Sequence, residues 1–403
     1  MLFTLSTCLL WLTLSGLQTI QAEDSHENMS TRSPYRNLAP NNADFAFSLF
    51  KNLVALNPNK DILISPISIS MALSMLTLGA GGHTRSQMLN GLGFKVDEIT
   101  ETEIHKSFQH LHDLLRLSDM HMGSTLFHNQ SLNLMELFSA DTKRYYGLEN
   151  LPVDFQDRAR SSSQINEYIK DKTQGEISDL FLELESTVTI ILINYVFFTG
   201  TWEHIFNPED TRLGDFYVDD TTVVQVPMMF QSSNVKHMYD PELGCLVVQL
   251  DYVGNSTAFL ILPDREQMDT VSQALSRETL DRWASSMINS RVELYVPRLS
   301  LSGNYDLGDI MKATGIADLW NNQTDLSHIT SNVQQKLSKV IHKTNLRITE
   351  KGKEAAAPPV STSGGQGETA QLTKIQINRP FILMIFDNVS WSSLFLGKVV
   401  NPS

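Results

Sequence analysis

The chain has 403 residues, a formal net charge of −14 and only two cysteines. An acidic surface disfavours nucleic acid and anionic membranes as partners, because both carry negative charge. With so few cysteines, stability must come from a buried core rather than from disulfides, and the chain is long enough to form one.

The first 22 residues carry no charged side chain and contain an apolar run over Leu9–Leu12. The run breaks at Ser15-Gly16 and leads to a small-residue cleavage pattern that ends at Ala22. We interpret residues 1–22 as a signal peptide. An uncleaved membrane anchor is the alternative, which the short and interrupted apolar stretch disfavours. The mature chain is therefore predicted to be secreted into an extracellular fluid such as blood plasma.

Cleavage after residue 22 would remove Cys8 and leave Cys245 as the single cysteine, so no internal disulfide is expected. On an exported chain, Asn-x-Ser/Thr sites are acceptors for N-linked glycans. Such sites begin at Asn28, Asn129, Asn255, Asn322 and Asn388.

The predicted elements change in type along the chain. Apolar residues at helical spacing predict a helix over Ala46–Val54 that stops at Asn57-Pro58-Asn59. Ser65-Pro66 has the pattern of an N-cap with proline in the first turn, which opens an apolar helix ending near Gly79. Helices are also expected over Glu101–Leu117, Ser163–Lys172 and, as a short pair, Met268–Ser286.

From Thr187 onward most of the chain has the pattern of strands. The β-branched and aromatic run Val188–Phe198 is typical of a strand buried on both faces. Helices mostly first and strands mostly later predict an α+β fold with large mixed sheets. No linker-like shift in composition divides the chain, so residues 23–403 are expected to form a single domain. Further strands are expected over Gly214–Val218, Val223–Met229, Gly244–Tyr252, Thr257–Leu262, Arg291–Pro297, Val340–Thr349, Phe381–Phe386 and Leu394–Val400.

One segment differs from the rest. Residues Ala355–Thr369 are small, polar and rich in glycine and proline, and they lie between two predicted strands. A loop of this length inside a domain is usually functional or disordered.

Several short motifs occur in an order that resembles the serpin family over essentially the whole mature length. The resemblance implies a serpin fold with three β-sheets, about nine helices and an exposed reactive-centre loop at about residues 350–372. The motifs are Leu63–Ser70, Lys172–Ile177, Asn194–Trp202, Phe216–Val218, Val226–Met229, Glu350–Gly352, Asn378–Phe381 and Phe395–Pro402.

Inhibitory serpins trap a protease when the cleaved loop inserts as a new central strand of the largest sheet. Gly352 fits such a hinge, as do the alanines that follow. Lys353 does not fit, because burial of an unpaired ammonium group costs several kcal/mol. Pro358 and Pro359 each lack an N–H for the ladder. A snorkelling lysine and a bulge at one proline would weaken this objection, so a protease inhibitor of the antitrypsin type remains the alternative.

Four further stretches, at Tyr252–Asn255, Ser276–Trp283, Gly315–Leu319 and Trp391–Phe395, are similar to the steroid-hormone carriers of the family. This resemblance implies an extracellular transport protein for cortisol, corticosterone and progesterone. It places the steroid-binding positions at Gln249, Asp281, Trp391 and Arg277. A thyroid-hormone carrier is a second alternative, which Trp391 disfavours by resemblance.

Each of these positions also has a simpler interpretation. Trp391, which follows the turn Asp387–Ser390, could be a core tryptophan. Gln249 shares a strand face with Cys245, Val247 and Asp251, and a mostly polar face usually meets solvent. Arg277 and Asp281 are four residues apart on one helix face and could form a surface ion pair.

A glycan on Asn388 would crowd the neighbourhood of Trp391, so either this site is unmodified or the pocket opens elsewhere. Val360, Ser361 and Thr362 form a small-residue stretch suited to an elastase-type protease. We hypothesise that cleavage there permits partial loop insertion and releases the steroid.

The chain lacks a Gly-x-Ser-x-Gly elbow, a His-Glu-x-x-His motif and a phosphate-binding glycine loop. His110 and His112 are two apart on a predicted helix, so their rings diverge. We therefore expect a monomer that is not an enzyme and has no metal or cofactor.

Overall fold

A computed structural model describes residues 36–403 except for 179, 182–183, 186–187, 322–323, 332–336 and 353–371. The predicted signal peptide, Asn28 and Asn322 lie outside the described residues. So do Lys353, Pro358, Pro359, Val360, Ser361 and Thr362 of the predicted loop.

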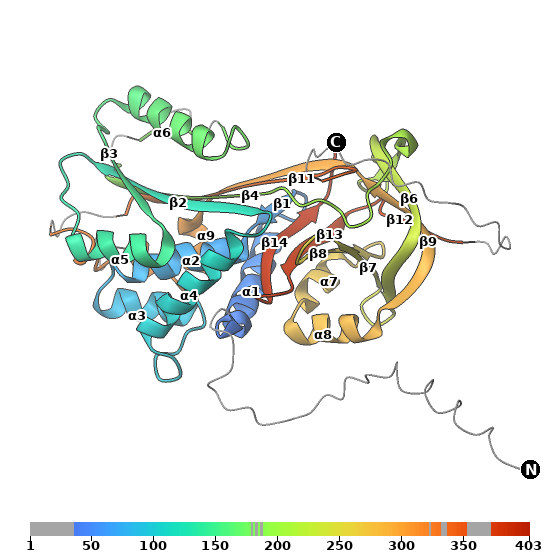
Figure 1. Cartoon of the computed structure of the whole chain (residues 1–403), viewed down its shortest axis with the longest axis horizontal. Helices are drawn as coiled ribbons and strands as arrows, with labels where there is room; N and C mark the ends of the chain where they lie inside the picture. The colour runs from blue at the N-terminus through green and yellow to red at the C-terminus, as the bar shows by residue number, and fades with distance from the viewer. Residues whose placement is uncertain are drawn as a thin grey trace, which may run out of the picture. The chain divides into compact units, whose positions relative to one another are not determined.

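Nine α-helices occur within the described residues, as expected (Figure 1). Helix α1 (Ala39–Leu56) begins with a proline in its first turn and ends at Asn57, where the sequence predicts a stop. Every residue of α2 (Pro66–Thr77) is buried. The other helices are α3 (Gly82–Gly91), α4 (Glu101–Leu115), α5 (Glu136–Tyr146), α6 (Arg158–Lys172), α7 (Met268–Ala274), α8 (Arg277–Ser286) and α9 (Leu307–Ala313).

The structure confirms Ser65 as the N-cap residue of α2 with Pro66 in the first turn, but the Ser65 side chain makes no cap hydrogen bond. Its hydroxyl caps no backbone N–H of α2 and is buried without a hydrogen-bond partner. The Ser65 backbone N–H instead donates to Nε2 of His342 over 3.0 Å. The start of α2 is therefore held by a tertiary contact rather than by a local cap.

A five-stranded sheet runs in the order β10 (Leu299–Asp306), β11 (Lys339–Ile348), β4 (Ile190–Phe198), β2 (Met120–Asn129) and β3 (Glu149–Val153). Strand β4 is buried on both faces, as predicted. Ile191 and Ile193 pack in the cluster that includes α6, while Leu192 and Val196 pack in the main core. Figure 1 accordingly shows α6 on one side of this sheet and α2, α4 and α5 on the other.

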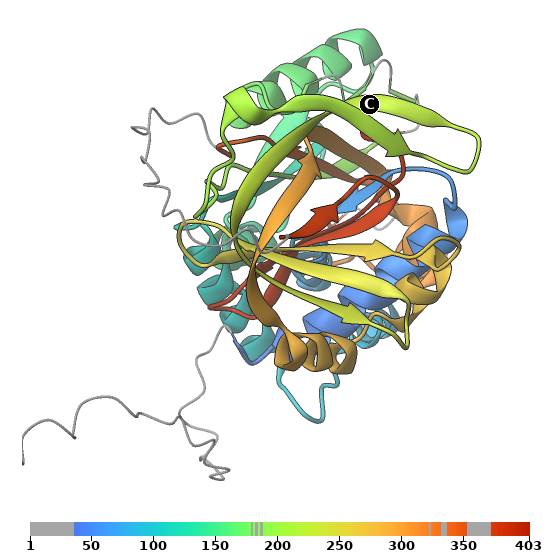
Figure 2. The same ribbon diagram turned by 90° about the vertical axis from the view of Figure 1, so that its right-hand side faces the viewer.

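A nine-stranded sheet makes up the rest of the strand structure (Figure 2). The 18-residue β6 pairs with β5 through its first part and with β7 through its last part. Two of the three expected sheets are therefore continuous through β6. The order is β1 (Ile62–Ile64), β14 (Ser392–Val399), β13 (Phe381–Asp387), β8 (Ser256–Pro263), β7 (Cys245–Asp251), β6 (Val223–Asp240), β9 (Ile288–Pro297) and β12 (Thr373–Gln376), with β5 (Arg212–Tyr217) on β6.

Strand β2 is among the elements that the sequence pattern did not predict. It contains Gly123, where an added Cβ would lie 2.3 Å from the hydroxyl of Tyr195 on the neighbouring β4. Glycine in a strand weakens the local signal and here makes room for a cross-strand ring.

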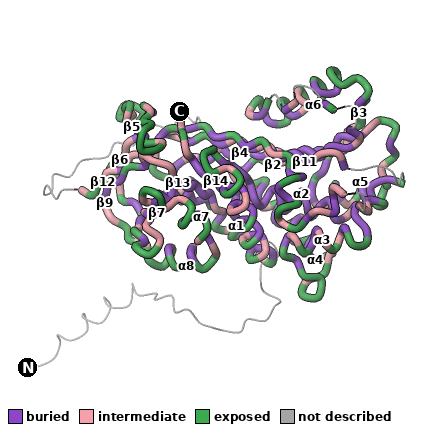
Figure 3. The backbone as a smooth tube through the Cα atoms, turned by 180° about the vertical axis from the view of Figure 1, so that it is seen from behind, coloured by how far each residue is buried: buried purple, intermediate pink, exposed green. Residues whose placement is uncertain are grey.

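Buried backbone runs through the strands and α2 in Figure 3. Within the part of the chain that the structure describes, no helix is both long and apolar enough to cross a bilayer. The same residues contain no group of three or more histidine, cysteine or acidic side chains arranged to hold a metal ion.

Candidate functional site

Trp391 lies in the tight turn between β13 and β14. The Asp387 carboxylate accepts hydrogen bonds from the N–H of Ser390 at 2.7 Å and from its hydroxyl at 2.6 Å. Trp391, the last residue before β14, adopts φ 56°, in the left-handed region that a bulky residue rarely occupies. Its side chain is 52% exposed, so the alternative of a core tryptophan is wrong.

One face of the indole is covered by a cation. The Arg36 guanidinium carbon lies 4.2 Å from the ring centroid of Trp391, and Arg36 Nε donates to the carbonyl of Val389 over 2.8 Å. Arg36 lies shortly before α1, which begins at Ala39, so the chain that enters this helix is attached to the β13–β14 turn.

Gln249 lies near the end of β7, on the same strand face as Cys245, Val247 and Asp251. This face is not a solvent face along its length, because Cys245 and Val247 are fully buried. It opens only near its end, where Gln249 and Asp251 are half-buried. Nε2 of Gln249 donates to Oδ1 of Asp251 over 2.9 Å.

A hydrogen-bonded chain connects Gln249 with the turn that carries Trp391. The Thr257 hydroxyl donates to Asp251 Oδ1 over 2.8 Å, and Asn388 Nδ2 donates to that hydroxyl over 2.9 Å. The chain crosses β7 and β8 and ends in the β13–β14 turn. It joins the predicted positions Gln249 and Asn388, which lie far apart in the sequence.

Two aromatic side chains that the sequence analysis did not single out lie on the same sheet face. Phe259 is the cross-strand partner of Gln249, and Phe386 is the partner of Thr257. Partners in adjacent strands project to the same side, so both rings share the face of Gln249 and Asp251. Both are half-buried. Both strands are nearly continuous apolar runs, so the sequence carries no signal that singles these two rings out.

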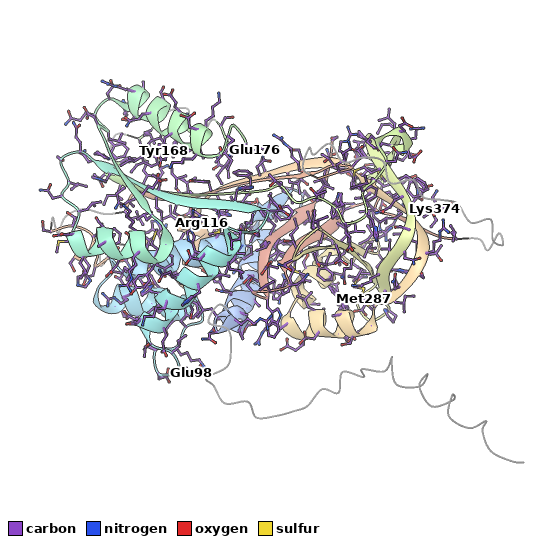
Figure 4. The ribbon with its side chains drawn as sticks, viewed as in Figure 1. Glu98, Arg116, Tyr168, Glu176, Met287 and Lys374 are labelled. Carbon is purple, nitrogen blue, oxygen red and sulfur yellow. The ribbon has the colours of Figure 1, made fainter. Side chains whose placement is uncertain are left out.

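Helix α8 is anchored to β6 through Asp240. The indole N–H of Trp283 donates to Asp240 Oδ2 over 2.7 Å, and Arg282 Nη2 lies 2.9 Å from the same oxygen. Figure 4 labels Met287, which lies where α8 ends and β9 begins.

Arg277 is paired, but its partner is Asp44 of α1 rather than Asp281. Its Nε and Nη2 atoms donate to the two carboxylate oxygens of Asp44 over 2.8 and 3.0 Å. This hydrogen bonding raises the pKa of Arg277. Asp281 is exposed, and its carbonyl accepts from the Ser285 hydroxyl over 2.8 Å. Helix α1 and the residues just before it therefore connect the two regions, since Arg36 contacts Trp391 and Asp44 of α1 contacts Arg277.

A pocket of about 260 Å³ opens beside the end of β7. Gln249 lines it, whereas Trp391, Arg277 and Asp281 do not. Of the four predicted positions, the structure thus places one in this pocket, two on α8 and one in the β13–β14 turn. The polar lining also includes His204, Gln231, Lys236 and Asp251.

Cys245 is free and buried. Burial raises the pKa of its thiol to about 12, so this cysteine is protonated and unreactive at neutral pH.

Three predicted glycan acceptors lie within the described residues. Asn129 is at the end of β2 and half-buried, while Asn255 and Asn388 are exposed. The two exposed sites are adjacent, because the Asn388 N–H donates to the Asn255 carbonyl over 2.8 Å. Occupancy of these sites stays a prediction.

The predicted hinge has its first residue at Gly352, where φ is 81°. An added Cβ would lie 1.9 Å from the carbonyl oxygen of Gly200. The preceding Glu350 is buried, forms an ion pair with Arg298 and accepts from the Thr211 hydroxyl at 2.7 Å. These contacts hold the hinge against the segment that follows β4.

Comparison with known proteins supplies independent information. Residues 40–402 match the family model Serpin (serine protease inhibitor). Corticosteroid-binding globulin from Bos taurus is 57% identical over all of both chains, and that from Homo sapiens is 53% identical over 99% of both. Human thyroxine-binding globulin, solved with bound thyroxine, has a TM-score of 0.86 and 36% identity, covering 92% of this chain and 100% of its own. Human glycosylated kallistatin has a TM-score of 0.84 and 39% identity, covering 92% and 99%.

Proposed function

The chain belongs to the serpin family, and from that premise we propose that it is a secreted carrier of corticosteroid hormones rather than an enzyme. The predicted serpin fold is confirmed by the family match and by the solved serpins with the same fold. Relatives named corticosteroid-binding globulin, at 47–57% identity along the chain, support corticosteroids as the ligand class, and we propose cortisol, corticosterone and the related steroid progesterone as ligands.

The observation that carries the proposal is the exposed indole of Trp391 in the turn where Asn388 ends a polar chain that leads to Gln249. A steroid is a rigid apolar plate with oxygen atoms at its ends, and it needs a flat aromatic surface and a few directed polar groups. Phe259 and Phe386 add aromatic surface on the sheet face of Gln249. Burial of roughly 400 Å² of apolar steroid surface contributes about 10 kcal/mol before association costs.

Release of the hormone on loop cleavage by an elastase-type protease is part of the proposal. The hinge and the polar chain meet at the segment that follows β4. The Trp202 N–H donates to the Lys351 carbonyl over 3.3 Å, and the Glu203 N–H donates to the Asp251 carbonyl over 2.9 Å. Movement of the hinge would therefore displace the backbone that holds Asp251.

The test is a titration of the purified glycoprotein with cortisol, followed by tryptophan fluorescence. We expect quenching in the parent and its loss in Trp391→Ala, because the hormone would lie against this ring. Trp320→Phe is the matched control, since Trp320 lies away from the turn and is partly buried.

Equilibrium dialysis that shows no retention of labelled cortisol, corticosterone or progesterone would contradict the carrier proposal. Thyroxine in the same assay tests the thyroid-hormone alternative. A covalent complex with elastase that survives denaturation would favour the inhibitor alternative instead.

A further inference from the structure

The amide of Gln249 has its orientation set by a carboxylate. Its Nε2 atom lies 2.9 Å from Oδ1 of Asp251, and an ionised carboxylate can only accept hydrogen bonds. A flipped amide would place Oε1 against Oδ1, so that two acceptors faced each other. Only one of the two orientations of Gln249 is therefore compatible with Asp251.

Asp251 is itself held from several sides. Oδ1 also accepts from the Thr257 hydroxyl over 2.8 Å, Oδ2 lies 3.6 Å from Nζ of Lys236, and the backbone carbonyl accepts from Glu203. The donated hydroxyl and the nearby ammonium group fix the position of the carboxylate. The carboxylate is therefore a fixed acceptor and not an adaptable one.

The other end of the Gln249 amide is free for a ligand. Among the residues that the structure describes, Oε1 has no hydrogen-bond donor, and the side chain lines the 260 Å³ pocket. We propose that Asp251 is a positioning residue that presents Gln249 Oε1 to the ligand as an acceptor, so that the site selects a steroid hydroxyl over a ketone at that point. This inference rests on the proposed function.

The selectivity follows from hydrogen-bond complementarity. A hydroxyl donates to Oε1, whereas a ketone oxygen at the same place would face a second acceptor and lose its hydration without replacement. Loss of one such bond in a half-buried site corresponds to roughly tenfold in the dissociation constant. Removal of Asp251 would let the amide flip and offer an N–H, which a ketone accepts.

The experiment compares dissociation constants for steroid pairs that differ only by oxidation of one hydroxyl to a ketone. Cortisol with cortisone tests the ring oxygen, and 20-hydroxyprogesterone with progesterone tests the side-chain oxygen. The ratio of the two dissociation constants within a pair is measured on one protein sample, so any misfolded fraction cancels.

The proteins are the parent, Asp251→Ala, Gln249→Leu, the double variant and Asp220→Ala. Asp220 is the matched control, because its exposed carboxylate pairs with Arg265 on a different part of the surface.

In at least one pair we expect the parent and Asp220→Ala to prefer the hydroxyl steroid about tenfold. In Asp251→Ala and Gln249→Leu the preference should fall to about threefold or less, and the double variant should show no further loss. An unchanged preference in Asp251→Ala, or equal binding of both members of each pair by the parent, would overturn the inference while leaving the carrier function intact. Absence of steroid binding by the parent would overturn the carrier function itself.

Discussion

At the scale of single residues, the structure separates side chains that support the fold from those that are available to a ligand. The ion pair between Arg277 and Asp44 is bidentate, yet the two side chains are 45% and 60% exposed. Solvent screens such a pair, and exposed pairs contribute about 1 kcal/mol or less. The ion pair of Arg277 therefore contributes little to the stability of the fold.

This leads to a prediction that separates structure from binding. Arg277→Ala should lower the free energy of unfolding by about 1 kcal/mol or less but weaken cortisol binding by roughly tenfold or more, because a charged hydrogen bond to the ligand is lost. Urea denaturation and equilibrium dialysis measure the two effects. Asp44→Ala removes the same ion pair while leaving Arg277 in place, so its affinity should stay near that of the parent. Equal loss of affinity in both variants would instead indicate that the pair is structural.

At the scale of elements, one buried histidine joins a helix to two strands. Nε2 of His342 on β11 accepts the Ser65 N–H at the start of α2, so Nδ1 carries the proton and donates to Asn194 Oδ1 on β4 over 2.7 Å. Burial lowers the pKa of His342 to about 3. The native contact therefore requires the neutral ring.

The sign of the pH dependence follows directly. Below pH 6.5 the unfolded chain binds a proton at this histidine, whereas the native chain does not until about pH 3. Stability is therefore full above pH 6.5 and falls as the pH decreases toward 3, by about 2 kcal/mol at pH 5. His342→Gln should show a correspondingly smaller loss between pH 7.5 and pH 5 in urea denaturation. His105, whose pKa burial lowers to about 4, should retain its own contribution in that variant. An identical pH dependence in parent and variant would refute this role.

The hinge provides a second prediction for an element boundary. Gly352 and Gly175 have similar φ values of 81° and 86°, but only Gly352 has a backbone oxygen in the space of a Cβ, whereas Gly175 has nothing within 4 Å. Gly352→Ala should therefore destabilise the protein by at least about 1 kcal/mol more than Gly175→Ala, since both pay for backbone strain but one also clashes. Thermal unfolding of the two variants gives the difference. Equal costs would mean that the hinge shifts freely away from Gly200.

At the scale of the whole molecule, β11 leads into the predicted loop, and the five-stranded sheet has no gap beside β11. β11 and β4 pair in parallel from Lys339 with Ile191 to Leu346 with Phe198. An inserted strand must replace this ladder with two new ones, so each added residue needs a free N–H and an uncharged side chain on a buried face. Lys353, Pro358 and Pro359 are expected to resist such insertion.

A variant with Lys353→Thr, Pro358→Ala and Pro359→Ala should therefore insert its loop more completely after cleavage. We expect the elastase-cleaved variant to unfold at a higher temperature than the cleaved parent protein. It should also lose more affinity for cortisol, because insertion moves the hinge. The uncleaved proteins, which keep the closed sheet, are the controls and should bind alike. Unchanged affinity after complete cleavage of both proteins would rule out release by this route.

Much of the fold was predictable because its signals are local. Helical spacing located α1, α2, α4 and α6, and the β-branched run located β4, since both patterns are read within a single element. Strand β2 escaped prediction because Gly123 and polar residues interrupt its pattern to accommodate Tyr195. The Ser65-Pro66 pattern located the start of α2 correctly, although the Ser65 hydroxyl caps no N–H and the Ser65 backbone N–H donates to His342 on a distant strand.

The sequence by itself determined the family, many elements of the fold and the four candidate binding residues, because motifs and periodicity are carried by neighbouring positions. Only the tertiary structure decided how those residues are connected. Arg277 of α8 pairs with Asp44 of α1, and the hydrogen-bonded chain from Gln249 through Asp251 reaches Asn388 in another turn. The exposure of Trp391 likewise depends on how separate elements pack. Such contacts depend on strand register and helix packing, which are set by burial across the whole domain rather than by any one segment.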